Sequence, residues 1–513
     1  MPAAPIYVQL AVRRGSDSET AMDAVEMDVF VPNATAAMTS SPASRAQRRL
    51  SGDNEPLITP AWEGPGDTSP TPSDSGDSVA ELGGSRATGV RGGTATALSE
   101  TRQATAGVAG TFINLMNAYT GSGLLGLPYA FQNSGLVAGL LVMAACGIMA
   151  THCMLLLVEC KGAMRHRGVV SYEDIVMTIL GPRAATAVGG FLVFTQYGFC
   201  VVYMVFLSDN IHTFFPQYTE AEARKATLAA LVPWFVALSW VRTLSALAVT
   251  SLIACFAIFP GLLIVLAASF VQISEATIPE DVDTFVVGVR WETLPVMMGV
   301  SIYAFEGIGI VIPSETAMRR PEKFPMALIA ALALSTILYS FFGAVPYVAF
   351  GNQTGYPTGQ ITSNVAEFAE AMGGRMWLQL QGLLRISFCI AIGLTLPTQL
   401  FVVSDIGEEC LFRPGRLSPR WKAAKQNFFR TSLVVFAAFL AIVIPRFGPL
   451  VSLIGSFGGS ALQFVFPPLC SLWMPMRTEQ LGFAAKALRW GYVAVGVLAG
   501  VAGTVMSFRE LVA

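Results

Sequence analysis

The chain has 513 residues, of which 53% are apolar and only 13% are charged, and its mean hydropathy is +0.57. A soluble protein carries about 25% charged residues, so this composition excludes an ordinary soluble enzyme. The formal net charge of −2 also gives no basic excess that would attract a nucleic acid. We expect an all-α polytopic membrane protein.

The first 106 residues differ in composition from the rest. They are rich in Ser, Thr, Gly, Pro and Ala, and they contain no apolar run long enough to span a membrane or to build a core. We expect residues 1–106 to form a disordered cytosolic tail and residues 107–513 to form a transmembrane transporter domain. Within the tail, the stretch Asp53 to Ile58 has the form of an acidic dileucine signal that sorting adaptors read, or it is a chance match to a short motif.

Apolar segments follow one another through the remaining chain. At about 20 residues for each crossing of the bilayer, we predict about eleven transmembrane helices. They lie roughly at residues 109–131, 136–158, 186–208, 227–241, 247–271, 294–317, 326–350, 377–401, 431–445, 449–473 and 489–508.

Basic residues are spread unevenly over the loops between these segments. If the N-terminus is cytosolic, most Lys and Arg residues fall in cytosolic loops, for example between Arg413 and Lys425, as the positive-inside rule expects. The triplet Asn352-Gln353-Thr354 then lies on the opposite side, where it is either a glycan acceptor or an unused sequon.

Two of the predicted spans are interrupted by glycine at their centres. The first reads NLMNAYTGSGLLGLPYAF from Asn114, and the second reads MMGVSIYAFEGIGIVIPSE and ends at Glu315. A helix breaks at mid-membrane only where the protein or a solute satisfies the freed backbone groups. Paired breaks therefore indicate a solute site and a transporter.

The groups at the first break suit a zwitterion. Gly121 and Gly123 let the chain leave helical geometry, and the helix that restarts at Leu124 presents free N–H groups to a carboxylate. Carbonyl groups near Asn117 and Tyr119 suit an ammonium group or a cation. The alternative is that the Gly-Ser-Gly stretch only permits close helix packing.

Two charged residues, Glu306 and Arg385, lie well inside predicted spans, away from their ends. Glu306 is central in the sixth, where a carboxylate is costly unless it is paired, hydrated or protonated, and we favour a role in proton binding over a structural hydrogen bond. Arg385 lies in the eighth span and either pairs with Glu306 or extends to the membrane surface. The second break lies five crossings after the first, an odd number, so the broken helices cross in opposite senses, as an inverted repeat requires.

Several strings together resemble one family. GSGLLGLPYAF, TQYGFCVVYMVFLSDN, YAFEGIGIVIPSE, LTLPTQLF and LIGSFGGSALQFVFPPL are similar to the amino acid/auxin permease family, in its vacuolar/lysosomal and proton-assisted amino acid transporter branch. The resemblance covers nearly all of the chain after residue 107. It implies a leucine-transporter-like 5+5 inverted repeat with discontinuous helices 1 and 6, and small neutral amino acids moved with protons.

The resemblance also assigns residues. It implies substrate binding at the first break and at the acid and glycines of the sixth span, namely Thr120, Gly121, Ser122, Gly123, Glu306, Gly307 and Gly309. The chain departs from the proton-assisted branch at Asn114, where that branch has histidine. Asn114, Asn117 and Thr395 resemble instead the sodium-coupled branch, so they are candidate ion ligands beside Glu306.

The sequence thus predicts a secondary active transporter of small neutral amino acids that works by alternating access, with proton coupling favoured and sodium coupling as the alternative. No ATP-binding motif is present, and neither catalysis nor a cofactor is expected. The other alternative is an amino acid sensor or scaffold that signals through its tail. We expect a multi-pass protein of the vacuolar or lysosomal membrane, or of the plasma membrane, with a cytosolic N-terminus.

Overall fold

The computed structural model describes residues 107–512, except for 165–168, 170, 216–218, 242–243, 276–286, 356–357, 412–418 and 475–480. Every regular element in these ranges is helical. The tail and its motif from Asp53 to Ile58 lie outside the described residues, so the expected disorder and the sorting signal stay predictions.

Nine helical segments of the described chain are long and apolar enough to cross a membrane. They are α4 (Leu136–Ala163), α6 (Pro182–Ile211), α8 (Leu244–Glu275), α9 (Leu294–Ala304) with α10 (Ile308–Ala317), α11 (Phe324–Phe350), α13 (Arg375–Leu411), α14 (Pro419–Val443), α15 (Phe447–Ile454) with α16 (Phe466–Trp473), and α17 (Phe483–Val512). The prediction of an all-α polytopic membrane protein is confirmed.

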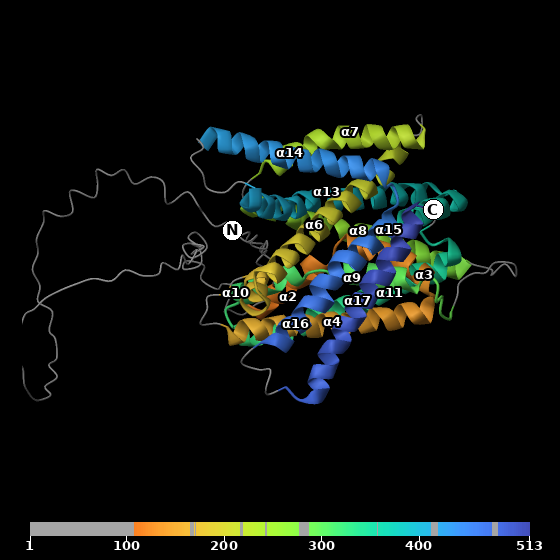
Figure 1. Cartoon of the computed structure of the whole chain (residues 1–513). Coiled ribbons are helices and arrows are strands. Elements are labelled where there is room, and N and C mark those ends of the chain that lie inside the picture. The colour runs from red at the N-terminus through yellow and green to blue at the C-terminus, as the bar shows by residue number, and fades with distance from the viewer. Residues whose placement is uncertain are drawn as a thin grey trace, which may run out of the picture. The chain divides into compact units, whose positions relative to one another are not determined.

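The other two predicted spans are also helical. The first coincides with α2 (Val108–Tyr119), η4 (Ser122–Gly126) and α3 (Leu127–Ser134), and the fourth with α7 (Glu220–Ser239). The count of eleven and the inverted repeat remain predictions. In Figure 1 most of these helices run side by side, and α7 packs along α14.

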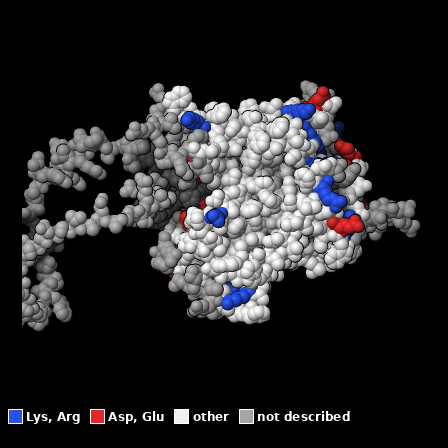
Figure 2. Space-filling model, viewed as in Figure 1, with Lys and Arg blue, Asp and Glu red and all other residues white. Residues whose placement is uncertain are grey.

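The surface of the helical domain matches a bilayer environment. Many large apolar side chains are exposed, including Leu141, Leu263, Ile337 and Phe439. Figure 2 shows a broad face without charged side chains, with Lys, Arg, Asp and Glu gathered at its margins. Such a belt would be unstable in water and is what lipid tails require.

Two short helices were not predicted. In α5 (Tyr172–Leu180), Ser171 and Asp174 form a reciprocal capping box that starts the helix. In α12 (Ile361–Met372), Gly373 ends the helix in the left-handed conformation. The helix α5 packs on α6 and α16, and α12 packs on α13 and α8.

The centre of the domain is formed by helices distant in sequence. The helix α11 packs against α2, α3 and α4, while α9 packs against α3, α15 and α17. The two broken helices therefore meet in the middle of the bundle, with α11 beside both.

Candidate functional site

The first break lies between α2 and η4. The helix α2 ends at Tyr119, and the N–H of Thr120 still donates to Met116 O at 2.9 Å. The backbone is extended at Gly121, whose N–H turns back to Tyr119 O at 2.9 Å, and a 3-10 helix starts at Ser122. The predicted discontinuity of the first span is therefore present where the sequence placed it.

The second break lies between α9 and α10. The helix α9 ends at Ala304, and α10 begins at Ile308 after Phe305, Glu306 and Gly307. The backbone of Gly307 has φ −177° and ψ 11°, which lies outside helical geometry. The sixth predicted span is thus also discontinuous, at the predicted acid and glycine.

The two breaks contact each other closely. The hydroxyl oxygens of Ser122 and Tyr303 are 3.0 Å apart. A Cβ atom added to Gly123 would lie 2.7 Å from the Cα of Ala304, and one added to Gly307 would lie 2.6 Å from the Tyr119 ring. Glycine is required at both positions because the neighbouring backbone and ring leave no room for a side chain.

The other two glycines have more space. A Cβ atom at Gly121 would meet nothing within 4 Å, and one at Gly309 would make an ordinary contact of 3.8 Å with Leu192. Gly121 therefore borders open space beside the break. The glycines of the first break have different surroundings, since Gly123 packs against α9 and Gly121 does not.

Three tyrosine and phenylalanine side chains border this junction. The ring of Phe199 from α6 makes an edge contact with Tyr303, with centroids 4.7 Å apart, and stacks on Tyr203 at 6.5 Å. The Tyr203 hydroxyl lies near the side chains of Ser122 and of Gln399 on α13. The side of the first break at Ser122 is therefore formed by hydroxyl groups on an aromatic wall.

Sequence reasoning missed the residue that joins the two helix ends. Tyr339 on α11 is buried, and its hydroxyl donates toward Tyr119 O and, at 3.1 Å, toward Ala304 O. These carbonyls belong to the last residues of α2 and α9. Only the apolar run around Tyr339 was visible in the sequence, and its partners are 220 and 35 residues away.

A second missed element is the π-helical run η9 (Gly455–Gly459) and η10 (Ala461–Val465). The side chain of Gln463 donates to Ile302 O at 3.0 Å, and Tyr172 of α5 donates to Leu462 O at 2.9 Å. A π-helix leaves backbone carbonyls displaced, and such runs are frequent at functional sites. The glycines of LIGSFGGSALQF mark this run, since a Cβ atom at Gly455 would lie 2.0 Å from Gly299 O.

These contacts place a donor at every carbonyl of the C-terminal end of α9. An α-helix leaves its last four carbonyls without partners inside the helix. Here each of the four has a donor. Ser301 O accepts from the N–H of Phe305 and Tyr303 O from the N–H of Glu306. Ile302 O accepts from the Gln463 amide, and Ala304 O accepts from the Tyr339 hydroxyl.

Glu306, the acid that the sequence singled out, lies in the second break between α9 and α10. It is 9% exposed, and neither carboxyl oxygen meets hydrogen-bond geometry with any described residue. The N–H of Ile308 lies near it at the start of α10, and the side chains of Tyr119 and Tyr172 lie close enough to interact with it electrostatically. A buried carboxyl group in this state is uncompensated, which is rare outside functional sites.

Arg385 has different neighbours from those considered in the sequence. Its electrostatic partners are Cys389 on its own helix and Glu370 of α12, and its Nε atom is buried without a hydrogen bond among the described residues. The structure does not place it against Glu306.

The candidate ion ligands are held by other contacts. Asn117 accepts a hydrogen bond from the Cys255 thiol of α8, and Thr395 donates to Ala391 O at 2.8 Å within α13. Thr120 donates in the same way to Met116 O at 2.9 Å. Asn114 is half-buried on α2. Within the described chain, no hydrogen bond joins Asn117 to Thr395.

A polar pair also ties the neighbouring helices at one end of the bundle. Lys161 at the end of α4 forms a buried ion pair with Glu315 of α10 and donates to Ile312 O at 3.3 Å. The half-helix α10 is therefore anchored at its far end while its beginning, at Glu306, lies in the junction. This arrangement can present one titratable acid and two sets of helix ends to a small solute.

Comparison with known proteins identifies relatives along most of the chain. The model of the family "Transmembrane amino acid transporter protein" matches residues 104–509. The chain is 27% identical over 417 residues to the amino acid transporter AVT3B of Arabidopsis thaliana, covering 78% of this chain and 93% of that protein. It is 30% identical over 414 residues to the amino acid transporter ANT1 of the same plant, covering 77% and 90%.

A yeast relative is longer. The chain is 29% identical over 386 residues to vacuolar amino acid transporter 4 of Saccharomyces cerevisiae, which covers 70% of this chain and 52% of the yeast protein. The chain thus spans about half the length of that relative.

Solved structures also align with the helical domain. A Na⁺-coupled sialic acid symporter in a substrate-bound outward-open state aligns with 13% identity and a TM-score of 0.42 over 78% of this chain and 96% of that chain. MhsT in complex with L-phenylalanine aligns with 12% identity and a TM-score of 0.40, over 78% and 98%.

Proposed function

We propose that this chain, which belongs to the transmembrane amino acid transporter family, carries small neutral amino acids across a vacuolar or lysosomal membrane together with protons. Its vacuolar relatives support the branch of the family that the sequence resemblance predicted and favour that membrane. Transport of amino acids by a secondary mechanism follows from the family; the substrate class, the coupling ion and the membrane are the proposal.

One observation carries the proposal, namely that two broken helices meet around a buried acid. The junction of Ser122 with Tyr303 brings the start of η4 to the end of α9, and Glu306 lies at the second break beside them. Half-helix N-termini favour a carboxylate, and half-helix C-termini favour an ammonium group. A zwitterion satisfies both.

The surroundings of the junction support a small, uncharged side chain on the substrate. Gly121 borders open space, whereas Gly123 and Gly307 are packed tightly. Phe199, Tyr203 and Tyr303 form the nearby wall, which carries hydroxyl groups but no charge. A basic or acidic substrate side chain would have to be desolvated there without an opposite charge beyond Glu306.

Proton coupling is favoured by the state of Glu306. An ionised carboxyl group without donors is costly in these surroundings, so the group gains by taking up a proton when the site is closed and releases it when one side becomes hydrated. The sodium alternative uses Asn114, Asn117 and Thr395, and of these Asn117 and Thr395 are each engaged in other hydrogen bonds.

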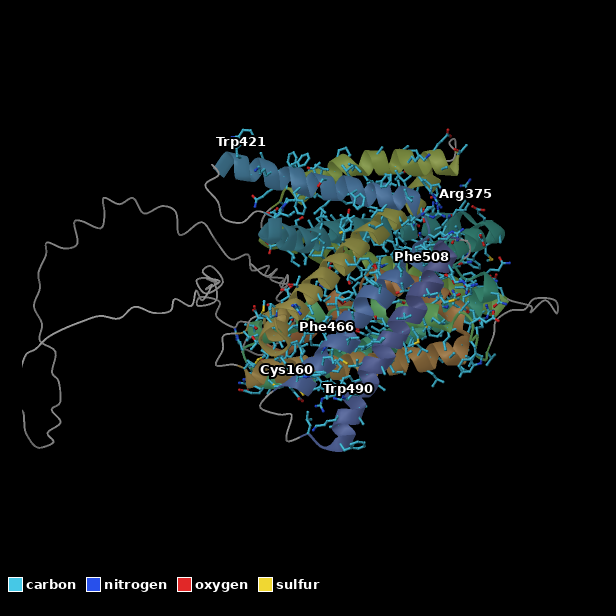
Figure 3. The ribbon with its side chains drawn as sticks, viewed as in Figure 1. Cys160, Arg375, Trp421, Phe466, Trp490 and Phe508 are labelled. Atoms are coloured by element: carbon cyan, nitrogen blue, oxygen red, sulfur yellow. The ribbon has the colours of Figure 1, made fainter. Side chains whose placement is uncertain are left out.

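The orientation belongs to the proposal as well. With the tail in the cytosol, Cys160, Trp421 and the basic loop before it face the cytosol, and Arg375 and Asn352 face the lumen. Figure 3 is consistent with this, because Cys160 and Trp421 lie toward one side of the helical domain and Arg375 toward the other.

The test is flux through the purified full chain in proteoliposomes, with a panel of amino acids and imposed pH or sodium gradients. In Glu306→Gln the shape and a hydrogen-bonding end remain but titration is lost, so pH-driven accumulation should vanish while exchange at equal pH persists. Glu322→Gln, which changes an exposed acid after the same span, is the matched control and should behave as the parent.

Two results would contradict the proposal. Accumulation driven by sodium in Glu306→Gln, with no response of the parent to pH, would replace proton coupling by sodium coupling. If the folded parent chain in the vesicles showed no flux with any amino acid, the proposal that it transports amino acids would be refuted.

A further inference from the structure

The hydroxyl of Tyr339 lies where two negative helix ends converge. The carbonyl of Tyr119 is at the C-terminal end of α2, the carbonyl of Ala304 is at the C-terminal end of α9, and one hydroxyl serves both. Tyr339 is 2% exposed, so this contact is buried within the bundle. The contact joins both breaks through a third helix, α11.

Each helix end carries a partial negative charge. The aligned peptide dipoles of a helix leave about half an elementary charge at its C-terminus, and two such ends that face one position attract a cation. A hydroxyl has only one proton, so it can donate fully to only one of the two carbonyls at a time. The position therefore holds a neutral donor where the field of the protein favours a positive ion.

We propose that the Tyr339 hydroxyl stands in for a monovalent cation between the ends of α2 and α9, and so positions the two half-helices without a bound ion. This inference rests on the proposed transport function and deepens it, because it names the residue that makes this junction independent of sodium. Tyr339 acts through the carbonyls that it holds and is a positioning residue.

The neighbours of Tyr339 fix its hydroxyl at this place. Its ring packs against Phe305 at 5.2 Å between centroids, and Ser335, one turn earlier, is also buried and contacts Met116 of α2. The hydroxyl cannot swing away without displacing these groups. Removing its oxygen would leave a space close in size to a water molecule between two carbonyl oxygens.

The experiment compares the parent with Tyr339→Phe, using the full chain in proteoliposomes. Amino acid exchange is measured at equal pH on both sides in choline, sodium or lithium chloride, and melting temperature is measured in the same salts. Tyr347→Phe is the matched control, because Tyr347 is a buried tyrosine of the same helix. Tyr339→His, which retains an N–H donor, is a second variant.

The expected result is a gain of cation dependence. In choline, Tyr339→Phe should lose about tenfold in exchange, since Ala304 O loses its donor and Tyr119 O keeps only the N–H of Gly121. Sodium or lithium should restore much of this activity and raise the melting temperature of the variant, with no such effect in the parent or in Tyr347→Phe. Tyr339→His should be less dependent on the cation than Tyr339→Phe.

Other outcomes would overturn the inference. These are unchanged exchange by Tyr339→Phe in choline, or a loss that no cation restores and that brings no cation effect on melting. If Tyr339→Phe does not fold, Tyr339→His decides. Exchange by Tyr339→His that depends on cations no more than exchange by the parent supports a donor role for Tyr339. Inactivity of Tyr339→His in every salt refutes it. If the parent transports no amino acid, the proposed function fails while the melting comparison still decides the role of Tyr339.

Discussion

Among single residues, the glycines of the first break separate packing from solute contact. Gly123 meets the backbone of Ala304, whereas Gly121 meets nothing. Both read alike in the sequence, as parts of one Gly-Ser-Gly stretch. The difference appears only when α9, which lies more than 170 residues further along the chain, is placed beside η4.

This difference predicts that alanine destabilises the fold at Gly123 but not at Gly121. Gly123→Ala should destabilise the fold by about 1–3 kcal/mol, because its Cβ atom would lie 2.7 Å from backbone that cannot yield easily. Gly121→Ala should fold as the parent, and any change should appear as a raised KM. Thermal melting in detergent and uptake kinetics measure the two effects, and equal melting temperatures for the two variants would contradict the assignment.

The sequence located the two helix breaks and the buried acid, but it did not locate the side chains that support them. Glu306 and the glycines could be predicted, because an acid and chain breaks are anomalous in an apolar span. Tyr339 and Gln463 could not, because a tyrosine or glutamine in a span has no distinguishing pattern and their partner carbonyls lie on other helices. The side-chain donors to the last carbonyls of α9 come together only when the helices pack.

At the scale of elements, Arg430 in the middle of α14 holds the ends of α13 and α7 together. From α14 it pairs with Glu408 of α13 at 2.6 Å and donates to Ser239 O and Val241 O at the end of α7, at 2.9 and 3.1 Å. Arg430 is 3% exposed. A guanidinium group suits this role because its planar fork of donors reaches a carboxylate and helix-end carbonyls at once.

Removing this group should leave a buried charge and open carbonyls behind. We expect Arg430→Ala to lower the free energy of unfolding by about 3–5 kcal/mol, as loss of one partner from a buried pair does. Lys425→Ala changes an exposed cation one turn and a half earlier on α14 and should have little effect. Thermal melting of the two variants is the measurement, and similar melting curves would show that the pair does not stabilise the bundle.

Element boundaries were predicted unevenly. The spans were recognised by hydropathy, but α7 begins at Glu220 and α14 at Pro419, well before the predicted starts at 227 and 431. Their first turns carry charged residues, which a hydropathy criterion rejects although they continue the helix. The helices α5 and α12 were missed because neither is apolar or long enough to resemble a span.

For the whole molecule, sidedness rests on the distribution of basic residues. We predict that a cysteine in place of Lys425 reacts with a membrane-impermeant maleimide from the cytosolic side and that one in place of Gln353 reacts from the other side. Both side chains are exposed in the structure. Reaction of both from the same side would refute the topology, and labelling after detergent treatment controls for access.

The sequon at Asn352 shows a limit of reading a motif alone. The Asn352 side chain accepts a hydrogen bond from Arg290, and Thr354 is fully buried and donates to Gly351 O at 2.6 Å. A glycan on this amide would compete with the contact to Arg290. The triplet was readable in the sequence, but its engagement in a folded loop was not.

The length of α13 has a consequence for the membrane in which the protein works. Its 37 residues correspond to about 55 Å of helix, whereas the hydrocarbon layer of a bilayer is about 30 Å thick. Helices tilt by up to about 40°, which does not absorb the whole difference, so turns of α13 must project among the lipid headgroups. The meeting of Glu408 with Arg430, near the end of α13, then lies close to the headgroup layer. A change in bilayer thickness would therefore change the surroundings of the contacts that Arg430 makes among α7, α13 and α14.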